Sequence, residues 1–358
     1  MHGRKPAQGD HSITALDVAQ AVGVSQSTVS RVLNKKAGAF ISASTQDRVL
    51  STARELGYVP NPSAQALRKG KTDLIGIILR ELDDPVFALL ASHLSIQLRG
   101  LGYHLILFNA QSDPREALEM KNLLNTRHAD GLIIMGDLLN GQKEIQQVVS
   151  MNRAVVSLFR KPFPGIGSVV TVDNDRGIEL ALTHLFEFGH DKIGFLGYDW
   201  LDDTELRQEA FERLMKATGR SLQPSWIQIG KGGIDGGYDT MKAMLAQSDP
   251  PTAVVACDDL TAIGAVSAAR DMGIDVPRDV SVVGFDDIHI SRYLPPPLTT
   301  VRMPVLGIST KVCELLMEAI RSGGTSRSQV YKIAPELIVR KSTAANSRRG
   351  SRGSSPRG

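Results

Sequence analysis

Residues 13–58 have apolar positions at helical spacing between residues that favour helix ends, which predicts three short helices. Thr14, three residues before Asp17, fits a capping box at the start of the first helix, and Gly23 ends it. Ser25 can cap the second helix. The apolar stripes of the second and third helices are Val29, Val32, Leu33, Val49, Leu50, Ala53 and Leu56.

The third helix is predicted to begin at Ser44 and Asp47, which repeat the capping-box spacing, and to end at Gly57. Three short helices in about 45 residues bury little apolar surface. This part of the chain therefore forms a small unit with little core of its own.

From Leu74 onward the pattern changes to continuous apolar runs separated by helical stretches. The runs include residues 74–79, 103–108, 131–135, 154–158, 192–197, 253–256 and 281–284. Strands that are apolar on both faces and alternate with helices are typical of parallel sheets covered on both sides. About ten such strands exceed one ordinary sheet, which predicts two doubly wound lobes with a ligand cleft at the carboxyl ends of their strands.

Polar and breaker-rich segments divide the chain into five parts. Residues 1–12 are predicted to form a flexible arm, and residues 59–71 a linker that is too short to be a stable helix alone. Residues 343–358 are rich in Ser, Gly and Arg and are predicted to be a disordered basic tail. The helical head then spans residues 13–58, and the two-lobed region spans residues 72–342.

The formal charge of +3 is unevenly distributed. Residues 1–71 carry +6 and residues 341–358 carry +5, which leaves −8 for the middle of the chain. A basic head on an acidic body predicts that the head, and not the whole protein, binds a polyanion.

Composition excludes several classes of protein. Cys257 and Cys313 are the only cysteines, too few for a disulfide scaffold or a cysteine zinc site. No apolar run reaches the roughly 20 residues of a membrane span, and the first residues lack the apolar core of a signal peptide. We therefore expect a soluble, cytoplasmic protein with no membrane partner, no metal and no cofactor.

The two helices joined by residues 23–25 form a helix-turn-helix candidate, with the second as the recognition helix. Gln26, Ser27 and Arg31 are predicted to reach base edges, since Gln pairs with adenine and Arg with guanine. Hydroxyl and amide side chains suit phosphate oxygens, which position a helix without reading sequence. Four of them lie along this helix: Ser25, Thr28, Ser30 and Asn34. Spacing alone leaves open an ordinary capped helical hairpin.

Residues 18–34 (VAQAVGVSQSTVSRVLN) and 56–61 (LGYVPN) closely resemble the DNA-binding head of the lactose-repressor (LacI/GalR) family of bacterial transcription regulators. The resemblance continues through residues 258–259 (DD), 282–287 (VVGFDD) and 296–300 (PPLTT). It covers essentially the whole chain between the arm and the tail, with several motifs in the family's order. It implies a small all-α helix-turn-helix head joined to a periplasmic-binding-protein-like α/β core of two doubly wound parallel-sheet lobes.

The resemblance also implies a sequence-specific transcriptional regulator, a repressor, whose operator affinity is controlled by a small-molecule effector between the lobes. It implies a homodimer whose heads lie in successive major grooves of a pseudo-palindromic double-stranded operator. The linker would fold on DNA as a hinge helix with Ala64 and Leu67 in the minor groove, where an apolar wedge kinks the duplex. Packing of Leu67 against the core is the alternative. Residues 343–358 contain no leucine for a tetramerising heptad, so we expect a dimer.

By the same resemblance, Arg207 and Asp286 occupy positions that hold the effector. Both follow predicted strands, where a guanidinium and a carboxylate can bind hydroxyls or a carboxylate. Asp258 follows another strand and joins them, and Phe87 and Arg160 complete the predicted effector site. The alternative for each is a partnered surface group that binds no ligand.

Two departures from the family put ordinary stacking on a sugar or purine in doubt. Val86 replaces one of two aromatic residues, and the glycine-rich loop at 230–237 has none. These departures favour a smaller or an acidic ligand, with Arg207 or Arg160 as its counter-charge. The effector is expected to be a small molecule such as a sugar or a sugar acid. Asp259 is interpreted as a structural or capping acid, and Asp287 is left open between structure and binding.

No residue pattern supports an enzyme. Asp202, Asp203 and Glu205 are interpreted as a solvated acidic loop. His184 and His190 lack metal-ligand spacing and are interpreted as surface or core histidines. The main alternative to a regulator is a ligand-binding protein of the periplasmic type without DNA function, which would need a signal peptide and leaves the head unexplained.

Overall fold

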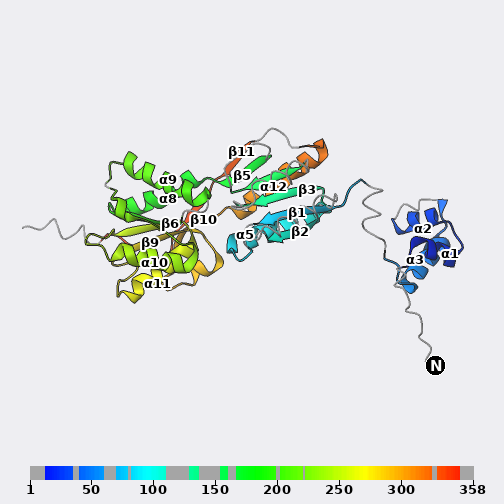
Figure 1. Cartoon of the computed structure of the whole chain (residues 1–358), viewed down its shortest axis with the longest axis horizontal. Coiled ribbons are helices and arrows are strands. Elements are labelled where there is room, and N and C mark those ends of the chain that lie inside the picture. Colours follow the sequence, from blue (N-terminus) through cyan, green and yellow to red (C-terminus); the bar gives the residue numbers. More distant parts are fainter. Residues whose placement is uncertain are drawn as a thin grey trace, which may run out of the picture. The chain divides into compact units, whose positions relative to one another are not determined.

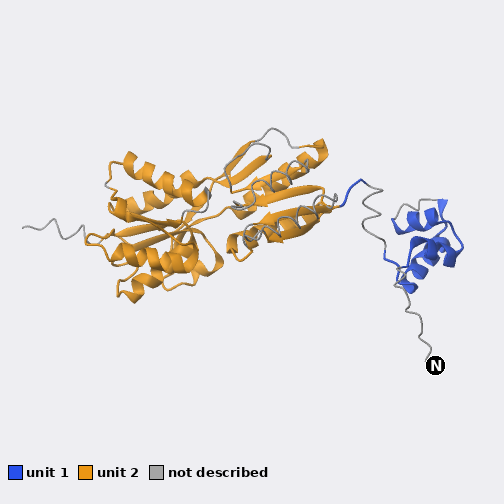
Figure 2. Ribbon diagram, in the orientation of Figure 1, with its two compact units in different colours: residues 1–72 blue, residues 73–358 orange. Residues whose placement is uncertain are grey.

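The computed structural model describes residues 13–34, 40–59, 70–79, 82–109, 129–136, 154–159, 167–198, 202–220, 222–324 and 329–346. The chain divides into two compact units, Met1–Thr72 and Asp73–Gly358 (Figure 2). No helix in the described part is long and apolar enough to cross a membrane. The predictions for the N-terminal arm, for Ala64 and Leu67 in the hinge, and for Arg160 lie outside the described residues.

The first unit contains three short helices whose ends follow from their capping residues. These are α1 (Ala15–Val22), α2 (Gln26–Leu33) and α3 (Ala43–Glu55). Thr14 and Asp17 form the capping box of α1, and Gly23 ends that helix in the left-handed conformation. The Ser25 side chain caps α2. The predicted starts of the first two helices are confirmed.

The third helix begins earlier than the sequence predicted. The hydroxyl of Ser42 accepts a hydrogen bond from the backbone N–H of Thr45, so the cap is Ser42, and the start predicted at Ser44 is wrong. Leu50 and Leu56 are exposed, although they belong to the predicted apolar stripe. The core of the head is correspondingly small and consists of Val18, Ala19, Val22, Val29, Val32, Val49 and Ala53.

The second unit begins with a parallel six-stranded sheet, which forms the first lobe (Figure 1). Its strand order is β11-β5-β4-β3-β1-β2. The strands are β1 (Leu74–Leu79), β2 (His104–Asn109), β3 (Gly131–Met135), β4 (Val155–Leu158), β5 (Ser168–Val172) and β11 (Val330–Ile333). Helices α5 (Pro85–Gly100) and α12 (Val305–Ser322) pack against each other and against this sheet in one apolar core.

The second lobe contains another six-stranded sheet, in the order β12-β10-β9-β8-β6-β7. The strands are β6 (Ile193–Tyr198), β7 (Ile227–Gly230), β8 (Ala253–Ala256), β9 (Ser281–Asp286), β10 (Thr299–Arg302) and β12 (Glu336–Ile338). All its pairings are parallel except that between β10 and β12. Two short 3₁₀ helices, η2 (Pro224–Trp226) and η3 (His289–Arg292), complete the described elements together with four α-helices.

Those four helices cover both faces of the second sheet (Figure 1). They are α8 (Asn174–Glu187), α9 (Asp202–Ala217), α10 (Gly233–Leu245) and α11 (Asp259–Asp271). Phe195 and Val283 share a core with α8 and α9, whereas their neighbours Leu196 and Val282 share a core with α10 and α11. Alternate residues of β6 and β9 are thus buried on opposite faces of the sheet, as predicted for a doubly wound lobe.

The glycine-rich stretch at 230–237 is not the expected loop, because most of it lies in α10. A Cβ at Gly237 would lie 2.1 Å from the carbonyl oxygen of Thr261 in α11, and one at Gly264 would lie 2.0 Å from that of Ile234. Hydrogen in place of a side chain therefore allows the backbones of α10 and α11 to approach closely.

The described chain crosses between the two lobes at three places. β5 leads to α8 through Asp173, β10 leads to α12 through Met303 and Pro304, and β11 leads to β12 through Ala334 and Pro335. The carboxyl ends of β5 and β10 therefore lie where the lobes join.

The segment that follows β12 packs on the second lobe as far as Asn346. The hydroxyl of Thr343 is hydrogen-bonded to His184, and the carbonyl of Ala344 accepts a hydrogen bond from His190. Both histidines are buried, as expected for core histidines. The prediction of a disordered tail from residue 343 is wrong for residues 343–346, because these polar contacts hold them.

Candidate functional site

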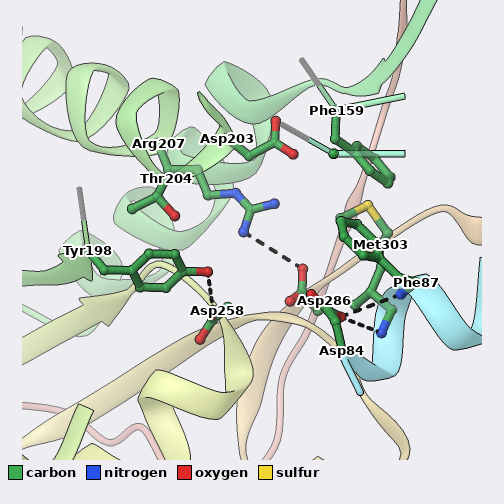
Figure 3. Close-up of a pocket in the computed structure, with 12 residues that line it drawn as sticks. Asp84, Phe87, Phe159, Tyr198, Asp203, Thr204, Arg207, Asp258, Asp286 and Met303 are labelled. Atoms are coloured by element: carbon green, nitrogen blue, oxygen red, sulfur yellow. Dashed lines mark hydrogen bonds and ion pairs between the residues drawn. The ribbon is translucent and has the colours of Figure 1, made fainter. Parts of the chain in front are cut away.

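A pocket lies between the two lobes, at the carboxyl ends of their strands (Figure 3). The described residues that line it are Asp84, Val86, Phe87, Gly136, Phe159, Tyr198, Asp203, Thr204, Arg207, Asp258, Asp286 and Met303. The structure thus brings together Phe87, Arg207, Asp258 and Asp286, four of the five residues predicted for the effector site.

Arg207 points from α9 toward Asp286 at the end of β9 (Figure 3). Its Nη1 lies 3.7 Å from Oδ1 of Asp286, and the two side chains are only 5 % and 12 % exposed. Nη1 also donates to the carbonyl of Cys257, and Nε donates to Oδ1 of Asn174 at 2.9 Å. The guanidinium carbon lies 3.7 Å from the centre of the Phe285 ring. These contacts fix the orientation of the guanidinium within the protein itself.

Burial and the positive charge of Arg207 act in opposite directions on the pKa of Asp286. Burial raises the pKa of Asp286 well above its ordinary value, and the positive charge of Arg207 offsets this only in part. Burial by itself lowers the pKa of Arg207, but the carboxylates of Asp286 and Asp203 reverse the effect and raise it. A ligand hydroxyl that donates to Asp286 would replace the hydrogen bonds with water that burial removed.

The backbone at the end of β9 is strained. Asp286 has a φ of 115° and Asp287 a φ of 55°, conformations that side-chain-bearing residues rarely adopt and that cost on the order of 1–3 kcal/mol each. Asp287 does not line the pocket, and its side chain is 3 % exposed and paired with Arg302 and Arg340. Asp287 therefore makes its contacts within the protein and does not face the pocket.

The neighbouring acids Asp258 and Asp259 have different roles. Asp258 is the N-cap of α11, where it accepts a hydrogen bond from the N–H of Thr261, and it also accepts one from the Tyr198 hydroxyl at 2.8 Å. Asp259 is fully buried, which raises its pKa to about 7 against the opposing effect of its hydrogen bonds. Its donors are Ser291 Oγ, Thr300 Oγ1 and Ile288 N. Asp259 is thus structural, as interpreted, and the cap is Asp258.

The first lobe contributes an aromatic wall. Asp84 caps α5 by accepting from the N–H groups of Val86 and Phe87, which brings Phe87 to the pocket at the start of the helix. The ring of Phe87 is stacked on that of Phe159, with centroids 6.0 Å apart and planes 10° apart. Phe159 was not predicted as a site residue, although its position directly after strand β4 was a usable signal.

Tyr198, Thr204 and Met303 were not predicted as site residues either, and Asp203 was interpreted as part of a solvated loop. That interpretation is wrong for Asp203, because α9 begins at Asp202 and Asp203 accepts a hydrogen bond from Asn174 at 2.9 Å beside the pocket. Tyr198 is the last residue of β6, so the rule that ligands bind at strand ends could have found it.

In the first unit, the predicted base-reading side chains of α2 are accessible. Gln26, Ser27 and Arg31 are exposed. A surface position is what a contact with base edges in a major groove requires. Their role on DNA stays a prediction.

The predicted phosphate contacts on α2 also stabilise the helix itself. The Ser25 hydroxyl accepts from the N–H of Thr28 at 3.1 Å, and the Asn34 amide donates to the carbonyl of Ser30. Ser25 and Asn34 therefore cap the two ends of α2, and their phosphate contacts remain predictions.

Comparison with known proteins decides the family. Residues 14–61 match the profile of bacterial regulatory proteins, lacI family, and residues 182–343 match a periplasmic binding protein-like domain. The HTH-type transcriptional repressor PurR of Haemophilus influenzae (strain PittEE) is 35 % identical over 333 residues, which cover 92 % of this chain and 98 % of that protein. This chain belongs to the lacI family of bacterial regulatory proteins.

Other transcriptional regulators are similar to this chain over comparable lengths. PurR of Pasteurella multocida (strain Pm70) is 32 % identical over 338 residues, covering 92 % of this chain and 98 % of that protein. The lac repressor dimer bound to operator and the anti-inducer ONPF has a TM-score of 0.82 and 26 % identity, over 93 % of this chain and 99 % of that one. The CelR–cellobiose complex has a TM-score of 0.69 and 26 % identity, over 92 % and 99 %.

This lacI-family protein is a DNA-binding transcriptional repressor with an effector-binding core, and it is not an enzyme. The prediction of a helix-turn-helix head on a periplasmic-binding-protein-like core is confirmed. The alternative of a ligand-binding protein without DNA function is set aside, since the head itself matches the family.

Proposed function

We propose that the repressor responds to a neutral, polyhydroxylated molecule, a sugar, bound between the lobes with Asp286 and Arg207 as its main polar partners. The observation that carries this proposal is the charge of the pocket. Arg207 is the one cation among the described lining residues, whereas four of them are carboxylic acids: Asp84, Asp203, Asp258 and Asp286.

Neutral hydroxyl groups suit this arrangement better than an acid does. Each ligand hydroxyl can donate to a carboxylate and accept from the guanidinium of Arg207. A sugar acid would bring a further negative charge among the four carboxyl groups, and Arg207 already pairs with Asp286. The Phe87 ring offers a flat apolar surface for the C–H face of a sugar. The pocket therefore favours the neutral sugar over the sugar acid.

On the DNA side, we propose that α2 lies in the major groove, where Gln26, Ser27 and Arg31 read bases. Ser25, Thr28, Ser30 and Asn34 would contact phosphates, and Ala64 and Leu67 of the hinge would enter the minor groove. The exposure of the three base-reading residues supports the first assignment. The lac repressor to which the chain is similar is a dimer bound to operator, which supports a homodimer on a pseudo-palindromic operator.

A thermal-shift panel tests the effector proposal. The full-length protein is heated with D-ribose, D-glucose, cellobiose, D-glucosamine, D-gluconate, adenine or guanine. A compound that binds the folded pocket, present at a concentration of about 100 times its Kd, adds roughly 2.7 kcal/mol to the free energy of unfolding. This raises the Tm by several degrees. We expect a neutral sugar to give the largest shift. A larger shift with D-glucosamine, D-gluconate or a nucleobase, or no shift with any neutral sugar, overturns the proposal.

A footprint of the neighbouring promoter region, with and without the compound that gives the largest shift, tests the coupling to DNA. Weaker protection with the compound identifies an inducer, and stronger protection identifies a corepressor, since linkage permits either sign. Unchanged sequence-specific protection contradicts effector control by that compound. A symmetric protected site supports the dimer, and protection of a single half-site contradicts it.

A further inference from the structure

Asp287 connects the pocket with two of the places where the chain crosses between lobes. Its Oδ2 accepts from Nε of Arg302 at 2.7 Å, and its Oδ1 accepts from Nη2 of Arg340 at 2.5 Å. Arg302 ends β10, directly before the crossing at Met303, and Arg340 follows β12, which the last crossing enters. We infer that Asp287 is a positioning residue, which holds Asp286 in place for the effector and couples the occupancy of Asp286 to these crossings.

The backbone shows why Asp286 needs such support. Both Asp286 and Asp287 have positive φ angles, which side-chain-bearing residues adopt only where the surroundings hold them. The carbonyl of Asp286 accepts from the N–H of Met303 at 3.2 Å, so its backbone is bonded to the crossing itself. The residue after Asp286 is Asp287, and its position is fixed by the two arginines that are bonded to its buried carboxylate. The direction of the Asp286 side chain follows from the contact at its own carbonyl and from the contacts of Asp287.

The two arginines differ in how firmly they are held. Arg340 is 13 % exposed and is itself anchored, because its Nη1 donates to the carbonyl of Leu298 at 2.8 Å. Arg302 is 42 % exposed, and its second pair, with Glu336, reaches the surface, where Glu336 is 64 % exposed. Solvent-exposed ion pairs contribute little to stability, whereas removing one partner of a buried ion pair strongly destabilises the fold. The buried contacts of Asp287 therefore hold the site, and Glu336 provides a matched control in the same network.

The first arm of the test needs no effector. Hydrogen exchange is measured by mass spectrometry on the full-length wild type and on Asp287→Asn, Arg340→Lys and Glu336→Gln. We expect exchange at residues 286–288 to rise at least tenfold in Asp287→Asn, because one of its two paired oxygens becomes an NH₂ group that faces an arginine. Arg340→Lys keeps the charge but loses the planar fork, so a smaller rise is expected. Glu336→Gln should exchange like the wild type.

The second arm rests on the proposed function, because it takes Asp286 as the effector's partner. Its probe is the panel compound with the largest thermal shift, titrated into each protein by calorimetry. We expect Asp287→Asn to weaken binding of this probe at least tenfold and Glu336→Gln to change it less than twofold. Operator affinity without the probe should change less than twofold in Glu336→Gln. A purely structural role would lower the Tm of Asp287→Asn and leave the Kd of the probe unchanged.

The two arms separate the possible failures. Wild-type exchange at residues 286–288 in Asp287→Asn overturns the positioning role, and so does an unchanged Kd in that variant. If none of the panel compounds binds the wild type, the sugar proposal fails, and the exchange arm still decides whether Asp287 holds Asp286. Equal effects of Asp287→Asn and Glu336→Gln would also overturn the inference, since the network would then not act through its buried part.

Discussion

The guanidinium of Arg207 lies 3.7 Å from the carboxylate of Asp286, and the two side chains reach the pocket from different elements of one lobe. Helix α9 supplies the cation, and the end of β9 supplies the acid. The aromatic pair of Phe87 and Phe159 belongs to the other lobe. The polar and the aromatic parts of the site therefore approach a ligand from opposite sides, so that bound ligand favours one arrangement of the lobes over others.

The first prediction concerns Arg207→Ala. The variant leaves Asp286 buried without its partner, and breaking a buried pair costs roughly 3–5 kcal/mol. The lone Asp286 carboxyl avoids this cost when it is protonated. The loss of unfolding free energy should therefore be largest near pH 8 and smaller near pH 5. Urea unfolding at the two pH values measures it. The panel compound that binds the wild type should no longer raise the Tm.

The control for this prediction is Arg213→Ala, which breaks a pair with Asp175 whose members are both more than half exposed. Such exposed pairs contribute less than about 1 kcal/mol, so the free energy of unfolding of Arg213→Ala should stay close to that of the wild type. Operator binding without effector should survive in Arg207→Ala. Its loss would mark Arg207 as structural, and equal destabilisation of both variants would contradict the buried-pair argument.

The second prediction concerns Asp259→Asn and pH. Burial raises the pKa of folded Asp259 to about 7, whereas an unfolded aspartate titrates near 3.8. Between these values the folded state binds the extra proton, so this group stabilises the fold at low pH and loses that effect as the pH rises toward 7. The difference in unfolding free energy between wild type and Asp259→Asn should change by up to about 1.4 kcal/mol per pH unit across this range.

Urea unfolding at half-unit steps from pH 4.5 to 8 checks this dependence. Asp239→Asn, at an exposed position of α10, is the control and should run parallel to the wild type. A constant difference between wild type and Asp259→Asn across the range would show that Asp259 is already ionised in the folded protein at low pH.

The third prediction concerns the segment Ser342–Asn346. A chain that ends at Asn346 should unfold like the full chain, whereas a chain that ends at Lys341 loses Thr343, the partner of His184, and the Ala344 carbonyl, one of the two partners of His190. At roughly 1 kcal/mol per hydrogen bond, the two histidine bonds alone correspond to about 2 kcal/mol, and the loss of further bonds, such as those that Ser342 makes to Thr299 and Val282, should make the total larger. Urea unfolding of the two truncated chains measures the difference. Equal stability would contradict the role assigned to this segment.

The same segment has a pH dependence of the opposite sign. Burial lowers the pKa values of folded His184 and His190 below their ordinary value, so the unfolded chain takes up protons first as the pH falls below about 6.5. The stability that the neutral histidines contribute is present above that pH and is lost below it. The chain that ends at Lys341 should show a weaker loss between pH 7 and pH 5.5, because its histidines are less buried.

The sequence predicted features that depend on local pattern. Short-range spacing predicts the capping box at Thr14 and Asp17. It also predicts strands that are apolar on both faces, and the acids that follow them, such as Asp286 at the end of β9. It predicted the start of α3 less well, because Ser42 and Ser44 are equally suitable caps by composition, and the choice between them depends on packing.

The rest of the site could not be predicted from spacing, because it depends on which elements meet. Asp203 and Asn174 are far apart in the chain, and only the packing of α8 on α9 brings them together beside Arg207. The same holds for Asp287 and Arg340, which pair because β12 returns beside β10. Adjacent acids such as Asp258 and Asp259 look equivalent in the sequence, and burial alone assigns one to the pocket and the other to the core.

The last prediction separates base reading from phosphate contact on α2. Gln26→Ala removes an exposed amide at the start of the helix, so it should cost about 1–3 kcal/mol at particular operator bases and relax the preference there. Ser30→Ala removes a hydroxyl while the carbonyl of Ser30 still accepts from Asn34, so the helix keeps its cap. It should weaken all operator variants alike. Gel shifts on a set of single-base operator variants distinguish the two. If both substitutions have the same profile across the set, α2 is not oriented with Gln26 toward the bases, and the proposed placement of the recognition helix is wrong.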